Sequence, residues 1–213
     1  PLSNLDAKLR VQMRTEITKL HHRLQTTFIY VTHDQTEALT MGTRIVVMKD
    51  GFIQQVDTPQ NVFDYPSNLF VAGFIGSPQM NFFDVKLERR GEDVMAVFGE
   101  NVIKVPEGKI KKLVDPSYVG KTVKMGIRPE NLHDEELFLQ NSPDSIIDAD
   151  VEVVELMGSE TYLYLKTVDS GINFIARVDA RSTSRAGDRI KIAIDANRLH
   201  FFDVDTEASI LNR

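Results

Sequence analysis

The sequence contains no cysteine among its 213 residues. Disulfide bonds, thiolate metal sites and cysteine nucleophiles are therefore excluded by composition. Long apolar runs are also missing: the run from Leu69 to Ile75 is far shorter than the roughly 20 residues of a membrane-spanning helix. There is no excess of positive charge either, since 25 Lys and Arg against 31 Asp and Glu give a formal charge of −6. This balance disfavours a nucleic-acid partner, because such proteins usually present a basic face.

The first six residues, Pro1-Leu2-Ser3-Asn4-Leu5-Asp6, lack both an initiator methionine and the charged-then-apolar pattern of a targeting signal. We expect the sequence to be the later part of a longer protein. Its length fits one large domain or two small ones, and we expect two.

The first third has helical and strand patterns in alternation. Apolar residues at steps of three and four predict one helix from Asp6 to about Gln25, with Ser3 and Asp6 as a capping pair. The continuous apolar run Phe28–Val31 predicts a strand buried on both faces of a parallel sheet. His33 then stands where that strand ends and the next helix begins.

Short turn and cap motifs organise the residues that follow. Asp34 and Glu37 have the capping-box spacing and predict a helix from Gln35 to about Met41. Asp50-Gly51 predicts a tight hairpin. Further helices are predicted after two caps, at Pro59–Asp64 and Leu69–Ile75. We place the domain boundary after the last of these, which gives domains 1–76 and 77–213.

Beyond residue 77 the helical period gives way to alternation of inward and outward residues, as in Ile172, Phe174, Ala176 and Val178. Turn-type sequences recur between the strands, for example at Pro106-Glu107-Gly108 and Ala186-Gly187-Asp188. Many short strands with regular turns predict a small barrel or sandwich.

Two motifs of the first third together resemble the ABC-transporter ATPases. Pro1–Asp6 is similar to the D-loop that follows the Walker B strand, and Thr32-His33-Asp34-Gln35-Thr36-Glu37-Ala38 is similar to the switch histidine and its helix. The resemblance implies that His33 contacts the γ-phosphate of ATP in the intact protein. It also implies that Ser3, Asn4 and Asp6 act across a dimer interface, with ATP and Mg²⁺ as cofactors. His33 read alone is equally a neighbour of a helix cap, and Asp6 is equally a simple cap.

The rest of the chain resembles the regulatory domain of the carbohydrate-importer branch of that family, an OB-type barrel. The resemblance rests on the joint from Asn68 to Pro78, on Gly126-Ile127-Arg128-Pro129-Glu130, and on Leu199-His200-Phe201-Phe202-Asp203. The implied fold is an α/β remnant of the ABC ATPase domain followed by an all-β OB-type regulatory barrel. Its implied partners are permease subunits in the membrane, a second copy of the chain, and a regulatory protein or metabolite. The implied location is the cytoplasmic face of the membrane.

Three motifs of an ATPase are missing from this sequence: the Gly-x-x-x-x-Gly-Lys-[Ser/Thr] loop, the Ser-Gly-Gly-Gln signature and the Asp-Glu of a Walker B strand. They supply the phosphate cradle, the contact across the dimer, the magnesium ligand and the base. We therefore expect this chain to bind no cofactor and to hydrolyse no ATP alone. The alternative function is a free-standing small-ligand-binding or regulatory β-barrel module.

Other polar groupings have simpler interpretations. His21 and His22 are adjacent on a helix, about 100° apart, so they do not share one metal ion unaided. Lys104, Lys109, Lys111 and Lys112 lack interleaved aromatic residues and are read as a solvated loop. The acidic run around His133 is read as exposed charge, and no metal site is predicted.

Overall fold

A computed structural model describes residues 6–212 of the chain. It divides into two compact units, Pro1–Ser67 and Asn68–Arg213. Each is described by itself.

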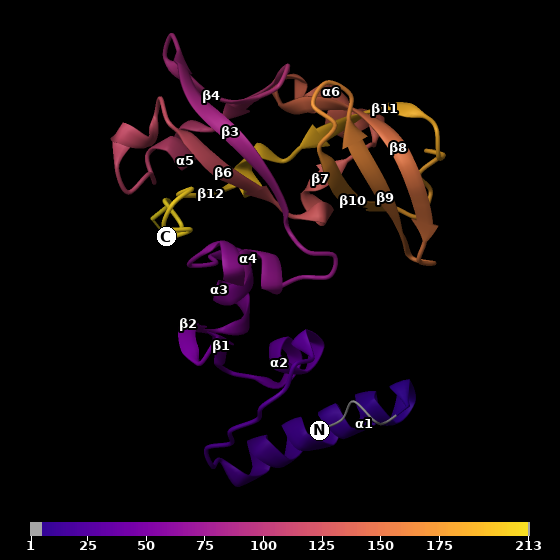
Figure 1. Cartoon of the computed structure of the whole chain (residues 1–213). Coiled ribbons are helices and arrows are strands. Elements are labelled where there is room, and N and C mark those ends of the chain that lie inside the picture. The colour runs from indigo at the N-terminus through magenta and orange to yellow at the C-terminus, as the bar shows by residue number, and fades with distance from the viewer. Residues whose placement is uncertain (1–5, 213) are drawn as a thin grey trace. The chain divides into compact units, whose positions relative to one another are not determined.

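Residues 6–67 of unit 1 form three helices and one hairpin (Figure 1). Its elements are α1 (Ala7–Leu24), α2 (Gln35–Met41), β1 (Ile45–Lys49), β2 (Phe52–Asp57) and α3 (Pro59–Asp64). Asp6, Asp34 and Thr58 are the N-caps of the three helices, and each side chain accepts a backbone N–H of the first turn. The predicted helices and hairpin of this region are confirmed.

The hairpin turns at the two residues that its sequence predicts. Asp50 has φ 52° and Gly51 has φ 82°, as a two-residue turn with left-handed backbone requires. The strands β1 and β2 pair antiparallel, from Ile45 opposite Asp57 to Lys49 opposite Phe52.

The predicted strand at Phe28–Val31 is wrong. Residues 25–34 form no strand, and Ile29 and Val31 are 90% and 80% exposed. A strand of a sheet needs at least one neighbouring strand to pair with its backbone N–H and C=O groups. The only sheet of unit 1 among the described residues is the β1–β2 hairpin, so this segment has nothing to pair with.

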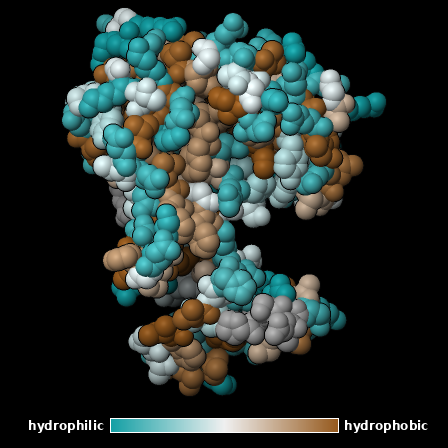
Figure 2. Space-filling model, viewed as in Figure 1, coloured by the Kyte–Doolittle hydropathy of each residue, from teal (hydrophilic) through white to brown (hydrophobic). Residues whose placement is uncertain are grey.

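The apolar face of α1 is only partly covered: Leu9, Met13 and Leu20 are 38%, 37% and 37% exposed, and the helix has no buried residue. Figure 2 shows brown, hydrophobic surface on unit 1. Its buried apolar residues are Ile45, Val47 and Val62. Among the described residues of unit 1, the buried apolar side chains therefore lie in the hairpin and α3.

Unit 2 consists mainly of strands that form two antiparallel sheets (Figure 1). One has the order β12-β6-β3-β4-β5 and the other β10-β9-β8-β11-β7. The strands of the first are β3 (Asn81–Arg90), β4 (Asp93–Phe98), β5 (Asn101–Val105), β6 (Thr122–Ile127) and β12 (His200–Phe202). Those of the second are β7 (Leu132–His133), β8 (Ile146–Leu156), β9 (Glu160–Thr167), β10 (Asn173–Asp179) and β11 (Arg189–Ile194).

Three short helices complete unit 2: α4 (Leu69–Phe74), α5 (Glu107–Ile110) and α6 (Glu136–Asn141). Single 3₁₀ turns lie at Pro116–Tyr118, Pro129–Asn131, Pro143–Ser145 and Ala196–Arg198. The expected turn at Pro106-Glu107-Gly108 is instead the start of α5, with Pro106 as its N-cap. The backbone N–H groups of Lys109 and Ile110 both donate to the carbonyl of Pro106, so the turn continues into the helix.

The two sheets of unit 2 share one apolar core. Phe83 of β3, 1% exposed, lies with its ring centroid 5.0 Å from Phe98 of β4 and 5.7 Å from Phe174 of β10. Phe174, Ala176 and Val178 alternate inward along β10, as their spacing predicts. The expectation of a β-rich second region is confirmed.

An asparagine links the sheets at their edge. The side chain of Asn81 donates from Nδ2 to the carbonyl of Ile175 at 2.9 Å and accepts the N–H of Ile175 on Oδ1 at 2.8 Å. Ile175 lies on β10, an outer strand of the second sheet. The buried amide thus takes the place of a neighbouring strand at this point.

Candidate functional site

His33 lies between a segment without regular structure and the first turn of α2, and it is exposed. Its neighbour Asp34 caps α2: Oδ1 of Asp34 accepts the N–H groups of Thr36 at 2.8 Å and Glu37 at 3.2 Å. The predicted position of His33 at the entry to a helix is confirmed. The strand that was to precede it is not formed.

The sequence identified Glu37 only as the second residue of a capping box, and the structure gives its carboxylate other partners. Glu37 is 1% exposed, and its Oε2 accepts the hydroxyl of Tyr30 at 3.0 Å and that of Thr32 at 2.6 Å. In a reciprocal capping box Glu37 would instead accept the N–H of Asp34, which here donates to Thr32 Oγ1 at 3.0 Å. Burial, and then the Glu37 carboxylate, raise the pKa of the Tyr30 phenol.

Asp6 has the role of a helix cap, since its Oδ1 accepts the N–H of Leu9 at 2.9 Å. Ser3 and Asn4 lie outside the described residues. Among the residues that the structure describes, no hydrogen bond or ion pair joins Asp6 to His33. The D-loop role of Asp6 across a dimer therefore stays a prediction.

Metal-ligand groups are absent from the described chain: no three His, Cys, Asp or Glu side chains of residues 6–212 are arranged to hold an ion. His21 and His22 have ring centroids 5.8 Å apart, and His21 lies edge-on to Phe28 at 5.6 Å.

No helix within residues 6–212 is both long and apolar enough to span a membrane.

Two of the four lysines of the unit 2 cluster pair with acidic neighbours. Lys104 pairs with Asp93 at 2.8 Å and Lys111 with Glu107 at 2.6 Å. Burial, and then Lys112 and Arg198, lower the pKa of Lys109. Exposed pairs of this kind contribute little stability.

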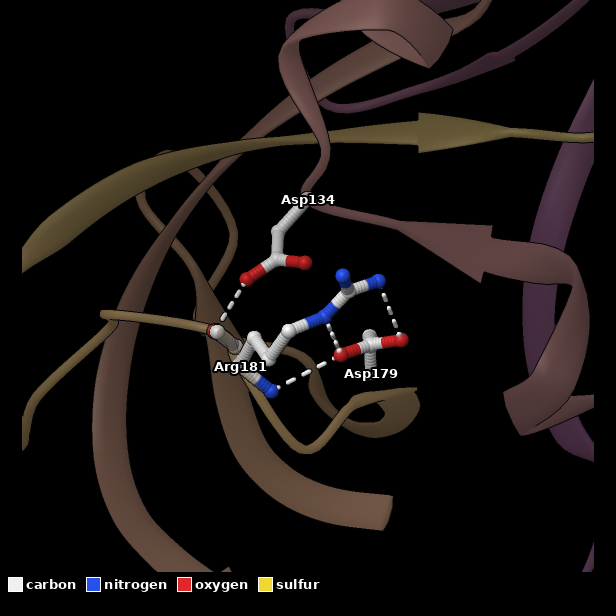
Figure 3. Close-up of polar contacts among 4 residues, drawn as sticks. Asp134, Asp179 and Arg181 are labelled. Atoms are coloured by element: carbon white, nitrogen blue, oxygen red, sulfur yellow. Dashed lines mark hydrogen bonds and ion pairs between the residues drawn. The ribbon is translucent and has the colours of Figure 1, made fainter. Parts of the chain in front are cut away.

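The acidic run after His133 holds two loops together (Figure 3). Asp134 Oδ2 accepts the hydroxyls of Ser182 and Ser184, which lie between β10 and β11. Arg181 pairs bidentately with Asp179, at 2.8 and 3.1 Å, and lowers the pKa of that carboxyl to about 2. A serine hydroxyl is a nucleophile only beside a base, and these hydroxyls donate to a carboxylate without a histidine. The contacts indicate a loop anchor.

His200 is the most strongly perturbed titratable group of unit 2. Burial lowers its pKa to about 3, with Lys109, Arg128 and Arg198 contributing in the same direction. A lowered pKa favours the neutral imidazole.

The joint from Asn68 to Pro78 is held to unit 2 at both ends of α4. The N–H of Leu69 donates to the carbonyl of Glu207 at 2.9 Å. At the other end, the buried Arg128 donates from Nη1 to the carbonyl of Ile75 at 2.6 Å. Gly76 follows with φ 127°, and a Cβ there would meet Arg128 Nη1 at 2.8 Å. The Gly-Ile-Arg-Pro-Glu motif thus anchors the joint.

Known families match most of unit 2. The model of the MalK OB fold domain matches residues 76–132, and that of the TOBE domain matches residues 125–202. The second region of the chain is therefore a domain of the OB and TOBE type.

Curated relatives cover 99% of the chain. It is 57% identical over 210 residues to the oligosaccharides import ATP-binding protein MsmX of Bacillus subtilis, and spans 56% of that protein. Identity is 47% over 221 residues to the multiple sugar-binding transport ATP-binding protein MsmK of Streptococcus mutans, of which 57% is covered. It is 49% over 212 residues to the osmoprotective compounds uptake ATP-binding protein GgtA of Synechocystis, of which 56% is covered.

Over 99% of its length the chain is similar to ATP-binding proteins of ABC sugar importers, which confirms the resemblance seen in its motifs. It spans about 56% of the length of the relatives that it matches. Among solved structures, the cytoplasmic molybdate-binding protein ModG covers 57% of the chain with a TM-score of 0.46 and 16% identity.

Proposed function

We propose that this chain is the C-terminal portion of the subunit that binds ATP and energises an ABC importer of sugars. The observation that carries the proposal is the 57% identity to an oligosaccharide-import ATP-binding protein over 210 residues, which include both the segment around His33 and the β domain. A regulatory module alone would need only the β domain.

In this proposal the intact protein uses ATP and Mg²⁺, and His33 contacts the γ-phosphate. The exposed imidazole at the entry to α2 is free to meet a ligand, because none of its described contacts occupies the ring. Asp6, with Ser3 and Asn4, serves the dimer interface. This chain by itself binds no nucleotide, since the Gly-rich loop whose amides cradle phosphates is missing from the sequence.

The partners follow from the same assignment. The intact protein docks on permease subunits at the cytoplasmic face of the membrane, and the OB-type domain meets a regulatory protein or metabolite. We keep residues 1–76 as the portion of the ATPase domain and 77–213 as the regulatory domain. The match to the MalK OB fold domain, which begins at residue 76, supports that division.

We further propose that the chain forms a homodimer. The support is the apolar surface of unit 1: Ile29 and Val31 are 90% and 80% exposed, and α1 buries no residue. Light scattering at micromolar concentration should report twice the chain mass of 24.1 kDa. A clean monomer would contradict it.

The function is tested by His33→Ala in the full-length protein that contains this segment. ATP turnover should fall by at least about 100-fold while nucleotide affinity changes little, because a γ-phosphate contact that strengthens during reaction acts on the transition state. His22→Ala, an exposed histidine on α1, is the matched control. Wild-type turnover in the His33 variant would remove this residue from the catalytic role.

A further inference from the structure

Glu37 is a buried carboxylate next to a chain segment that is otherwise largely exposed. It is 1% exposed, whereas Phe28, Ile29 and Val31 nearby are 46%, 90% and 80% exposed. Glu37 is also the one buried residue of α2. A glutamate is seldom buried unless its carboxylate has partners, so the contacts of Glu37 need an explanation.

Those contacts form a chain of hydrogen bonds around His33. Thr32, the residue before it, donates from Oγ1 to Glu37 Oε2 at 2.6 Å. The same Oγ1 accepts the N–H of Asp34, the residue after it, at 3.0 Å. Tyr30 adds a second donor to Oε2 at 3.0 Å. Glu37 therefore holds the backbone on both sides of His33 through one threonine hydroxyl.

The arrangement limits how the imidazole can move. Asp34 is fixed a second time, since its own carboxylate caps α2 at Thr36 and Glu37. With both neighbours fixed, His33 retains the rotation of its own side chain and little backbone freedom. A group that must meet a phosphate in one geometry acts faster when its support is rigid before the ligand arrives.

Packing alone does not account for a glutamate here. Its other oxygen, Oε1, is buried and has no hydrogen-bond partner among the described residues. A buried oxygen without a partner costs stability that an apolar side chain of similar size would not. The hydroxyl contacts that Oε2 makes are what an apolar residue could not supply.

We propose that Glu37 is a positioning residue for His33, acting through the hydroxyl of Thr32; this rests on the proposed function of His33. Glu37 itself touches no reacting group in this proposal. It sets the place from which the imidazole reaches the phosphate.

The first test uses this chain and reads the Asp34 amide, which donates to Thr32 Oγ1. Its hydrogen exchange should accelerate at least about tenfold in Glu37→Ala, and stay within about threefold of wild type in Glu37→Gln, whose amide oxygen still accepts both hydroxyls. Glu136→Ala, an exposed first-turn glutamate of α6, is the control. Internal controls are the Ala38 and Gly42 amides, which donate within the helix and should keep their protection.

If Glu37→Ala unfolds α2, a second pair of variants tests the proposal. Thr32→Val leaves Glu37 and the Asp34 cap in place but removes the bridging hydroxyl, and should accelerate Asp34 exchange to the same extent. Thr32→Ser restores the hydroxyl and should restore protection. Unchanged exchange at Asp34 in both Glu37→Ala and Thr32→Val would overturn the proposal.

The third readout is ATP turnover of the full-length protein that contains this segment. Glu37→Ala should lower kcat about tenfold with KM for ATP within about twofold, and Glu37→Gln should recover most of it. Faster exchange with unchanged kcat would overturn the positioning role. If His33→Ala itself turned over at the wild-type rate, the proposed function of His33 would fail, and the exchange data would still report whether Glu37 holds the backbone.

Discussion

The two units of this chain contain similar kinds of residue but bury them very differently. In unit 2, alternate side chains along the strands point into one core that the two sheets share. In unit 1, an 18-residue helix with a regular apolar face buries no residue at all. The difference shows that caps and spacing indicate where a helix lies, whereas burial of its apolar face depends on partners elsewhere in the chain.

The same contrast holds for two apolar segments of similar appearance. Residues 173–179 form β10 because β9 pairs with them along their length. Residues 28–31 are richer in β-branched and aromatic side chains, yet they form no strand. Pairing therefore decides the outcome more than intrinsic strand preference does.

The strongest test of this contrast separates the units. Residues 68–213 expressed alone should fold and unfold cooperatively, because their core is self-contained, while residues 1–67 alone should show little tertiary order. Circular dichroism and proton NMR of the two fragments would check this. A well-dispersed NMR spectrum from residues 1–67 would contradict the expected contrast between the two units.

One substitution made in both units gives the next largest effect. Phe83→Ala should lower the free energy of unfolding by about 3–5 kcal/mol, because Phe83 is 1% exposed and packs on two other rings. Phe28→Ala should cost less than about 1 kcal/mol, since that ring is 46% exposed and lies edge-on to His21. Urea unfolding measures both. Equal costs would mean that Phe28 has a core that the structure does not show.

A polar link between the sheets of unit 2 has an intermediate effect. Asn81→Ala should cost about 2 kcal/mol, because it leaves the N–H and carbonyl of Ile175 on an outer strand without their partner. Asn173→Ala, an exposed residue of the same strand, should change the unfolding midpoint little. A neutral Asn81→Ala would show that water replaces the amide at no cost.

The smallest expected effect is that of Asp203→Asn on thermal stability at acid pH. Hydrogen bonds from the Thr206 N–H and hydroxyl, and then from the Tyr118 hydroxyl, lower the pKa of Asp203 to about 2. Because this folded-state pKa is depressed, the stabilisation is present above about pH 4 and is lost as the pH falls toward 2. Asp203→Asn should therefore flatten the decline in thermal midpoint between pH 4 and pH 2. An unchanged slope would assign that decline to other carboxyls.

Local signals made much of unit 1 predictable. The caps at Asp34 and Thr58 and the Asp50-Gly51 turn act within a few residues, so the sequence is enough to place α2, α3 and the hairpin. The strand at 28–31 was not predictable in this way, because whether it forms depends on residues far away in sequence.

The same distinction between local signals and contacts distant in sequence holds for the candidate site. His33 was placed correctly at the entry to a helix because its neighbour is a cap residue. Glu37 was read only as half of a capping box, and the spacing that suggested it does not reveal that its carboxylate turns instead to Tyr30 and Thr32. The anchoring of the joint by Arg128 depends on a contact 53 positions away in sequence, which no local pattern shows.

The central claim is that this chain is part of an importer ATPase without a phosphate-binding site of its own. Calorimetric titration of the chain with Mg-ATP tests it most directly. The account predicts no binding heat, because the sequence has no Gly-rich loop whose backbone amides could hold the phosphates. Saturable binding with micromolar affinity would contradict it.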